Sequence, residues 1–172
     1  MQKVLFTLAL VFTLLAIHND SPLVEQTVVS LNLPQYEDLN KEQKKEIDCL
    51  THNIYREAGI EPEDGKIAVG LVTMNRVKTE GFPETVCKVV QEKRKHTCQF
   101  SWVCMKNLPR VDQQIYSYSR SLAIKVFFNH DKIKDTTQGA LFYHADYVRP
   151  RWNKLEVTTK IGRHIFYKPG EA

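Results

Sequence analysis

Glu57 is the residue whose position in this sequence best suits acid–base chemistry. It is expected near the C-terminal end of an amphipathic helix, directly before Ala58-Gly59. The negative end of the helix dipole and the flanking apolar groups both disfavour an ionised carboxylate there, so both raise its pKa. A raised pKa suits a general acid that works near neutral pH. The alternative is an ordinary glutamate on the exposed face of a helix.

A second candidate segment covers residues 97–103, where apolar and polar residues alternate. This period of two predicts a strand or hairpin. Gln99 and Ser101 would then share one face and form hydrogen bonds to a ligand. Phe100 and Trp102 would lie on the opposite face, toward the core.

The elements that must position these residues are mainly helices. Helices are expected from the cap at Asn40 to Gly59, from Pro62 to Gly81, over 83–90, and from Asp112 to Asn129, with short β segments over 141–144 and 158–167. The last β segment should turn at Ile161-Gly162. Gly70, within the second helix, predicts a close approach by another backbone. The fold class expected is therefore α+β, a mainly helical single domain with small β hairpins.

Composition sets broad limits on function. The chain has 172 residues, of which 42% are hydrophobic, and a net charge of +4. This length predicts one domain with a real core, outside the range of disordered proteins. The charge excess is mild and scattered, so nucleic acid is not an expected partner, although an anionic polymer or membrane surface is favoured. The sequence contains no repeat or low-complexity tract, which excludes solenoid and fibrous classes.

The N-terminus resembles an export signal. One lysine, Lys3, precedes an apolar run over residues 4–17, which is shorter than the roughly 20 residues of a stable spanning helix. We therefore expect residues 1–18 to be a signal peptide, or an anchor through which residues 4–17 associate transiently with a membrane. The alternative is a buried helix of the domain. Residues 19–40 are expected to be a tether to a domain over residues 41–170, in an exported and monomeric protein.

The predicted export decides how the four cysteines are interpreted. In an oxidising space an even number predicts disulfides, with three possible connectivities. Cys98 and Cys104 bracket five residues and form the natural pair, which leaves Cys49 with Cys87. Free buried thiols are the alternative. A zinc site is less favoured because the chain lacks Cys-x-x-Cys. Neither a metal nor another cofactor is predicted, and the loop that holds Asp131 and Asp135 is expected to be solvated.

Ordered blocks of sequence over residues 48–167 resemble the cell wall hydrolase family that includes the spore-cortex-lytic enzymes of SleB/CwlJ type. The blocks are Cys49-Leu50, Ile54-Tyr55-Arg56-Glu57-Ala58, Gly65-Lys66-Ile67-Ala68-Val69, Asn75-Arg76-Val77, Phe82-Pro83, Val86-Cys87, Cys98-Gln99-Phe100-Ser101-Trp102, Ala140-Leu141-Phe142-Tyr143-His144, and Ile161-Gly162 with His164 and Phe166-Tyr167. That family is similar to lytic transglycosylases and goose-type lysozymes. The resemblance therefore implies a lysozyme-like fold.

The resemblance also implies an activity. The substrate would be the peptidoglycan glycan strand, cleaved between N-acetylmuramic acid and N-acetylglucosamine. Glu57 matches the single essential glutamate, which acts first as acid and then as base. Such single-glutamate routes are exceptions to the usual pair of carboxylates. The substrate-contacting residues implied are Gln99, Phe100, Ser101, Tyr143, His144 and Trp152. For His144, His164 and Trp152 a structural role is the alternative, and Asn75-Arg76 is expected to support helix packing or an ion pair.

One departure from the family keeps other functions open. After its glutamate the family commonly reads Ala-Arg-Gly-Glu, whereas this chain reads Ala58-Gly59-Ile60-Glu61 and lacks the arginine. Glu61, Glu63 and Asp64 are expected to form a solvated acidic turn. A non-catalytic peptidoglycan-binding module is therefore one alternative. An amidase that cuts the glycan–peptide bond is another, although the histidines show no zinc-ligand motif.

Overall fold

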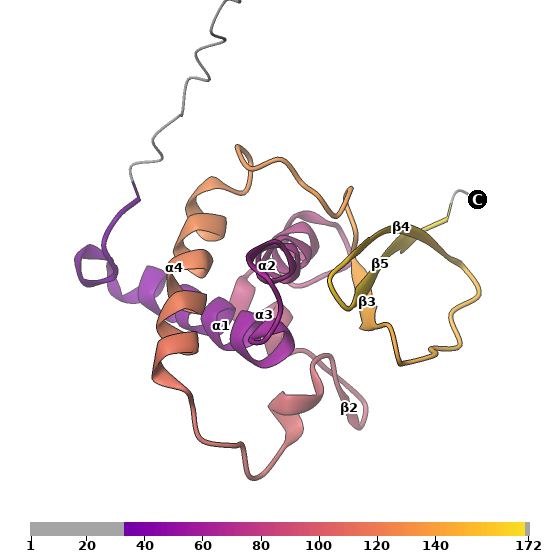
Figure 1. The fold of residues 1–172 in the computed structure, drawn as a ribbon, viewed down its shortest axis with the longest axis horizontal. Helices are drawn as coiled ribbons and strands as arrows, with labels where there is room; N and C mark the ends of the chain where they lie inside the picture. Colours follow the sequence, from indigo (N-terminus) through magenta and orange to yellow (C-terminus); the bar gives the residue numbers. More distant parts are fainter. Residues whose placement is uncertain (1–32, 171–172) are drawn as a thin grey trace, which may run out of the picture. The chain divides into compact units, whose positions relative to one another are not determined.

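The computed structural model describes residues 33–170 and shows a helical body with a small sheet on one side (Figure 1). The helical elements are η1 (Tyr36–Asp38), α1 (Lys41–Ala58), α2 (Glu63–Lys78), α3 (Val86–Val90), η2 (Ser101–Cys104) and α4 (Gln113–Asn129). The strands are β1 (Lys93–Arg94), β2 (Thr97–Cys98), β3 (Phe142–Ala145), β4 (Leu155–Ile161) and β5 (His164–Pro169). This mixture confirms the α+β class predicted from sequence.

The two long outer helices begin where the sequence predicts. Asn40 and Gln43 form a reciprocal capping box at the start of α1, and Asp112 accepts from two backbone amides at the start of α4. These bonds satisfy amide groups that a helix leaves unpaired at its N-terminus. The helix expected over 83–90 is shorter, because Thr85 caps it and the helix begins at Val86.

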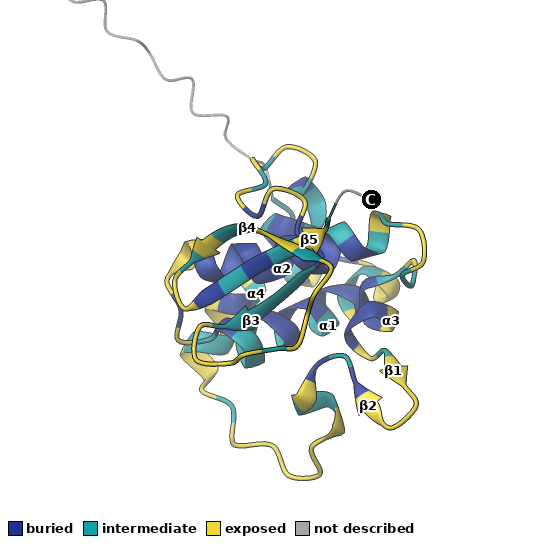
Figure 2. Cartoon of the chain, turned by 90° about the vertical axis from the view of Figure 1, so that its right-hand side faces the viewer, coloured by how far each residue is buried: buried dark blue, intermediate teal, exposed yellow. Residues whose placement is uncertain are grey.

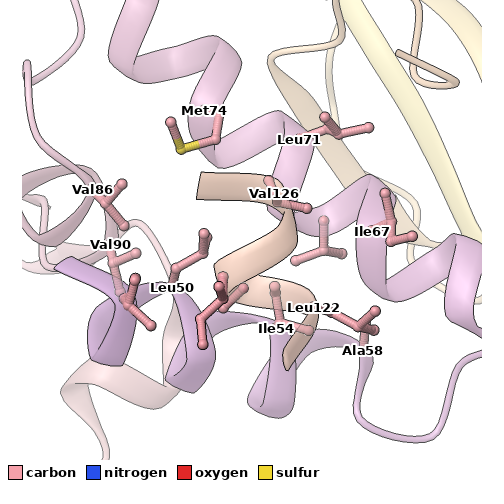
Figure 3. Close-up of a cluster of buried hydrophobic side chains, with 14 of the residues drawn as sticks. Leu50, Ile54, Ala58, Ile67, Leu71, Met74, Val86, Val90, Leu122 and Val126 are labelled. Atoms are coloured by element: carbon pink, nitrogen blue, oxygen red, sulfur yellow. The ribbon is translucent and has the colours of Figure 1, made fainter. Parts of the chain in front are cut away.

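Helix α2 is the centre of the core. Most of its residues are buried, and side chains from α1, α2, α3 and α4 interlock around it (Figure 3). A Cβ at Gly70 would lie 3.2 Å from Ile54 and 3.4 Å from Val126. The close approach predicted at Gly70 is therefore made by side chains of α1 and α4, and not by another backbone.

The sheet lies in front of the helices in Figure 2 and has the antiparallel order β3-β5-β4. Its inner face packs on α2 through Phe166, Ala68 and Val72. Strands β4 and β5 turn at Gly162, as the sequence predicts. The second, two-stranded sheet pairs only β1 with β2.

The strand expected over 97–103 is wrong beyond Cys98. The chain bends at Gln99 and Phe100 and then forms the 3-10 helix η2. The Cys98–Cys104 disulfide closes this bend, while Phe100 turns into the core. Because the alternation ends there, Gln99 and Ser101 do not share one face of a strand.

Both predicted disulfides are present. Cys49–Cys87 joins α1 to α3, and Cys98–Cys104 closes the bend before η2. Both bonds stabilise the fold by restricting the unfolded chain, the longer loop more strongly.

The predicted signal peptide, the membrane association of residues 4–17 and most of the tether lie outside the described residues. The described part of the tether, residues 33–40, contacts the domain. Tyr36 donates to both carboxylate oxygens of Asp48 at 2.8 Å, and Leu39 is buried in the core. Within residues 33–170, no helix combines the length and apolar character needed to cross a membrane.

Candidate active site

Glu57 lies half-buried in the last turn of α1, one residue before the helix ends at Ala58. The hydroxyl of Tyr143, on β3, donates to Glu57 Oε2 at 3.3 Å. Burial raises the pKa of the Glu57 carboxyl, and the Tyr143 hydrogen bond and the charge of Arg76 only partly offset this. Burial also raises the pKa of Tyr143 well above its usual value, so this hydroxyl stays a donor. The pair has the properties of a general acid with a fixed partner.

Arg76 is the buried cation of the site and only 2% exposed. Its Nε donates to the carbonyl of Leu141 at 2.7 Å. With the Gln99 amide oriented so that its oxygen faces the guanidinium, Gln99 accepts from Nη1 and Nη2 at 3.1 and 3.2 Å. The guanidinium carbon lies 5.5 to 5.7 Å from the ring centres of Phe82, Phe100 and Phe142. Arg76 thus holds the Gln99 bend and the start of β3 against α2.

The structure places the 99–101 block beside this cation. Gln99 lies directly on the Arg76 guanidinium, and Ser101 is exposed at the start of η2. Phe100 is only 4% exposed and packs in the core against Arg76. This burial favours a supporting role beneath the site, and the expected contact of Phe100 with substrate stays a prediction.

The pairing of β3 with β5 separates the remaining predicted residues into two groups. Tyr143 pairs with Phe166 on the inner face, toward Glu57, whereas His144 pairs with Ile165 on the outer face. Trp152 packs against His144 and the other outer-face rings. His144 and Trp152 consequently lie on the other face of the sheet from Tyr143, and their expected contact with substrate stays a prediction.

Glu61 is a residue whose role the sequence analysis missed. It is only 7% exposed, and its carboxylate accepts from the backbone amide of Arg163 at 2.9 Å. Lys66 donates to the Glu61 carbonyl. The solvated turn expected here is therefore wrong for Glu61, which fixes the β4–β5 turn to the start of α2. The available signal was the resemblance, in which Glu61 matches the glutamate at the end of the expected Ala-Arg-Gly-Glu stretch.

His164 lies on the inner face next to Tyr143, with ring centres 5.3 Å apart. It is buried, and burial lowers its pKa, although the charges of Glu61 and Asp146 act in the opposite direction. No described group lies within hydrogen-bond distance of its Nδ1. Its position supports a packing role behind Tyr143.

The loop that holds Asp131 and Asp135 is ordered by hydrogen bonds. Asp135 accepts from Asn75, Thr137 and Gly139, and these bonds lower its pKa although burial acts the other way. Asn75 thus joins α2 to this loop, as its expected packing role requires. Within residues 33–170 no three His, Cys, Asp or Glu side chains gather where they could hold a metal ion.

A hollow of about 730 Å³ runs along the first half of α1. Trp102 and Val103 border it, directly after the 99–101 block, and Lys41, Lys45 and Lys93 lie around it. Glu57 does not line this hollow. This hollow is therefore separate from the pair formed by Glu57 and Tyr143.

Comparison with known proteins identifies the family of this chain. The sequence profile of the cell wall hydrolase family matches residues 60–167, so the chain belongs to that family. This confirms the resemblance stated above. Because the matched range begins just after Glu57, the role of this glutamate rests on the geometry of the site.

The curated relatives that this chain matches include spore cortex-lytic enzymes. The enzyme of Bacillus cereus is 31% identical over 128 residues, which cover 73% of this chain and 45% of the relative. The enzyme of Oceanobacillus iheyensis is 30% identical over 141 residues, covering 81% of this chain and 45% of the relative. The chain therefore spans less than half the length of these curated relatives.

Two solved structures share the fold. The catalytic domain of the germination-specific lytic transglycosylase SleB from Bacillus anthracis matches with a TM-score of 0.56 and 32% identity, covering 76% of this chain and 99% of that domain. The catalytic domain of Bacillus cereus SleB matches with a TM-score of 0.51 and 25% identity, covering 80% and 97%. The described domain thus corresponds to the catalytic part of such enzymes.

Proposed function

We propose that this chain is a peptidoglycan glycosidase, a lytic transglycosylase or muramidase that cleaves the β-1,4 bond between N-acetylmuramic acid and N-acetylglucosamine. The observation that carries the proposal is the half-buried Glu57 carboxyl, whose pKa is raised by burial and which Tyr143 holds at 3.3 Å. The family membership and the SleB-like fold support the substrate class.

Glu57 performs both proton transfers in the proposed mechanism. Its protonated carboxyl donates to the glycosidic oxygen while the bond from that oxygen to the muramic C1 breaks. The resulting carboxylate then removes a proton from the nucleophile that attacks C1. Attack by the muramoyl 6-hydroxyl closes an anhydro ring, and attack by water gives a reducing end. In both cases Glu57 ends protonated, ready for another cycle.

The surrounding residues support the two forms of this carboxyl differently. The hydrogen bond from Tyr143 and the charge of Arg76 stabilise the carboxylate after it has given its proton, while burial favours the protonated form before that step. Gln99, which lies on Arg76, and the exposed Ser101 are the proposed contacts to a sugar acetamido group. Glu61 is not proposed as a second catalytic carboxylate, because the Arg163 amide already occupies it.

We also propose that the protein is exported and acts as a monomer on glycan strands. The two disulfides support an oxidising compartment. The apolar run over residues 4–17 supports a signal peptide or an anchor at the start of the chain. Remodelling of a cell's own wall and phage-encoded lysis would both use this chemistry.

The test is digestion of purified peptidoglycan followed by mass analysis of the soluble products. Anhydro-muramic ends would identify a transglycosylase and reducing ends a muramidase, and either supports the proposal. Release of peptides from intact glycan would instead identify an amidase. Sedimentation with the wall without any soluble product would indicate the binding module, and both of these results would contradict the proposal.

A further inference from the structure

The outer face of the sheet carries a cluster of aromatic rings, of which Phe142 also contacts Arg76 and the others have no part in the proposed mechanism. Phe142, His144 and Tyr167 lie on this face, which is turned to the viewer in Figure 2, and Trp152 packs against all three. The ring centres of Trp152 and Tyr167 are 5.4 Å apart. Trp152 is nevertheless 41% exposed. The other three rings therefore hold Trp152 in place, while part of its own ring stays exposed to solvent.

A hollow of about 350 Å³ lies beside this cluster, within the size range of small-ligand sites. His144, Trp152 and Tyr167 line it together with Arg149. A flat indole beside a hollow suits the apolar face of a sugar ring, because it offers a large rigid surface at low entropic cost. The hollow belongs to the opposite face of the sheet from Tyr143 and Glu57.

The polar groups of the hollow form a directed chain of hydrogen bonds. His144 Nδ1 lies 2.8 Å from the carbonyl of Ala145, which can only accept, so this nitrogen carries the proton. In this tautomer Nε2 accepts from the Tyr167 hydroxyl at 2.7 Å. The Tyr167 oxygen, with its own proton already used, presents a lone pair as an acceptor. A sugar hydroxyl is a suitable donor to it.

The charged residues that line this hollow are one cation, Arg149, and one anion, Asp146. Residues 146–163 contain five Lys and Arg but only two Asp and Glu, so they hold three of the four net positive charges of the chain. Asp146 is paired with Lys160 at 3.2 Å and Arg163 at 3.7 Å. Within the described residues no ion pair forms at Arg149. Because Asp146 is already paired, Arg149 favours an acidic ligand in this hollow.

We infer that this outer hollow is a second glycan-binding site, which holds an acidic N-acetylated glycan strand while the Glu57 site acts elsewhere on the wall. Trp152 supplies the stacking surface, Tyr167 accepts from a sugar hydroxyl, and Arg149 meets the lactyl carboxylate of a muramic acid from which the stem peptide has been removed. The ligand class rests on the proposed function, and the site itself is independent of Glu57. Two contacts on opposite faces of one sheet would keep the enzyme on an insoluble substrate between cleavages.

Binding is tested without cleavage in a Glu57→Gln background, with glycan strands that have lost their stem peptides and are immobilised on beads. Trp152→Ala should weaken co-sedimentation with these strands about tenfold, as the loss of an aromatic anchor does elsewhere. Tyr147→Ala is the matched control, because Tyr147 is an aromatic residue of the same segment, 74% exposed and outside the hollow. Trp152→Phe should retain most of the binding, which separates ring loss from misfolding.

A second readout observes the site directly. The chain contains two tryptophans, so a Trp102→Phe, Glu57→Gln protein reports from Trp152 alone. Its emission should change saturably as peptide-free muramic glycan fragments are added. The inference is overturned if Trp152→Ala sediments like the control, if the emission stays constant, or if only strands that retain their peptides bind. A protein that binds through Trp152 yet releases no glycan product would refute the proposed function alone.

Discussion

The contact between Glu61 and the β4–β5 turn gives a quantitative prediction about how the sheet is held. Gly162 has a φ of +55°, and a Cβ on it would overlap Glu61 Oε2, which accepts from the Arg163 amide. Gly139 also has a positive φ, +77°, but a Cβ there would meet nothing within 4 Å. Alanine at the two positions therefore has the same type of backbone cost but different neighbours.

The difference between the two substitutions follows from these contacts. The left-handed conformation costs an alanine about 1–2 kcal/mol at either site. Gly162→Ala must in addition displace Glu61, and a hydrogen bond to a charged group contributes about 1.5–3 kcal/mol. We expect Gly162→Ala to lower the free energy of unfolding by about 3–4 kcal/mol and Gly139→Ala by about 1–2 kcal/mol.

Urea unfolding measures both values, and a thermal scan should show a loss of roughly 10 °C for Gly162→Ala and about 4 °C for Gly139→Ala. A double-mutant cycle isolates the contact. In a Glu61→Ala background, Gly162→Ala should cost no more than Gly139→Ala does. Equal costs for the two glycines in the wild-type background would refute the argument.

Three further predictions concern the site and its support. Glu57→Gln should be more stable than wild type above neutral pH. The pKa of Glu57 is raised in the folded protein, so its contribution to wild-type stability is full below the pKa of the unfolded chain and is lost as pH rises through the folded pKa. Unfolding midpoints that differ by the same amount at pH 4 and pH 8 would contradict this prediction. Arg76→Lys should lower wall cleavage at least about tenfold, because a lysine cannot hold Leu141 and Gln99 together; undiminished initial rates would oppose it. Serine at both Cys49 and Cys87 should lower the free energy of unfolding, measured in urea, by about 4 kcal/mol. Serine at both Cys98 and Cys104, which close the shorter loop, should lower it by about 2 kcal/mol. The reverse order would contradict the loop-length reasoning.

Local signals in the sequence predicted much of this fold correctly. The caps at Asn40 and Asp112 act within one helical turn, and the Cys98–Cys104 pair is close along the chain, so neither needs knowledge of the tertiary structure. The strand expected over 97–103 failed because a disulfide and the burial of Phe100 overrode the alternating pattern. Glu61 was missed because its partner, the Arg163 amide, is about a hundred residues away in sequence.

The sequence predicted which residues belong to the candidate site but not how they are arranged. Glu57 and Tyr143 do lie together, as the family resemblance implied. The separation of His144 and Trp152 from them depends on the pairing register of β3 with β5, since a shift of one residue would exchange the two faces. The bond between Arg76 and Gln99 likewise joins two segments whose contact no local pattern encodes.

The central claim is that Glu57 is the acid and base of a glycan-cleaving site. Its most direct test is the initial rate of product release from purified peptidoglycan by wild type, Glu57→Gln and Glu80→Gln, the last a matched change at an exposed glutamate. We predict that Glu57→Gln folds normally and loses at least a factor of about 10² in rate, whereas Glu80→Gln retains the wild-type rate. A folded Glu57→Gln protein that releases glycan products as fast as Glu80→Gln would contradict the claim.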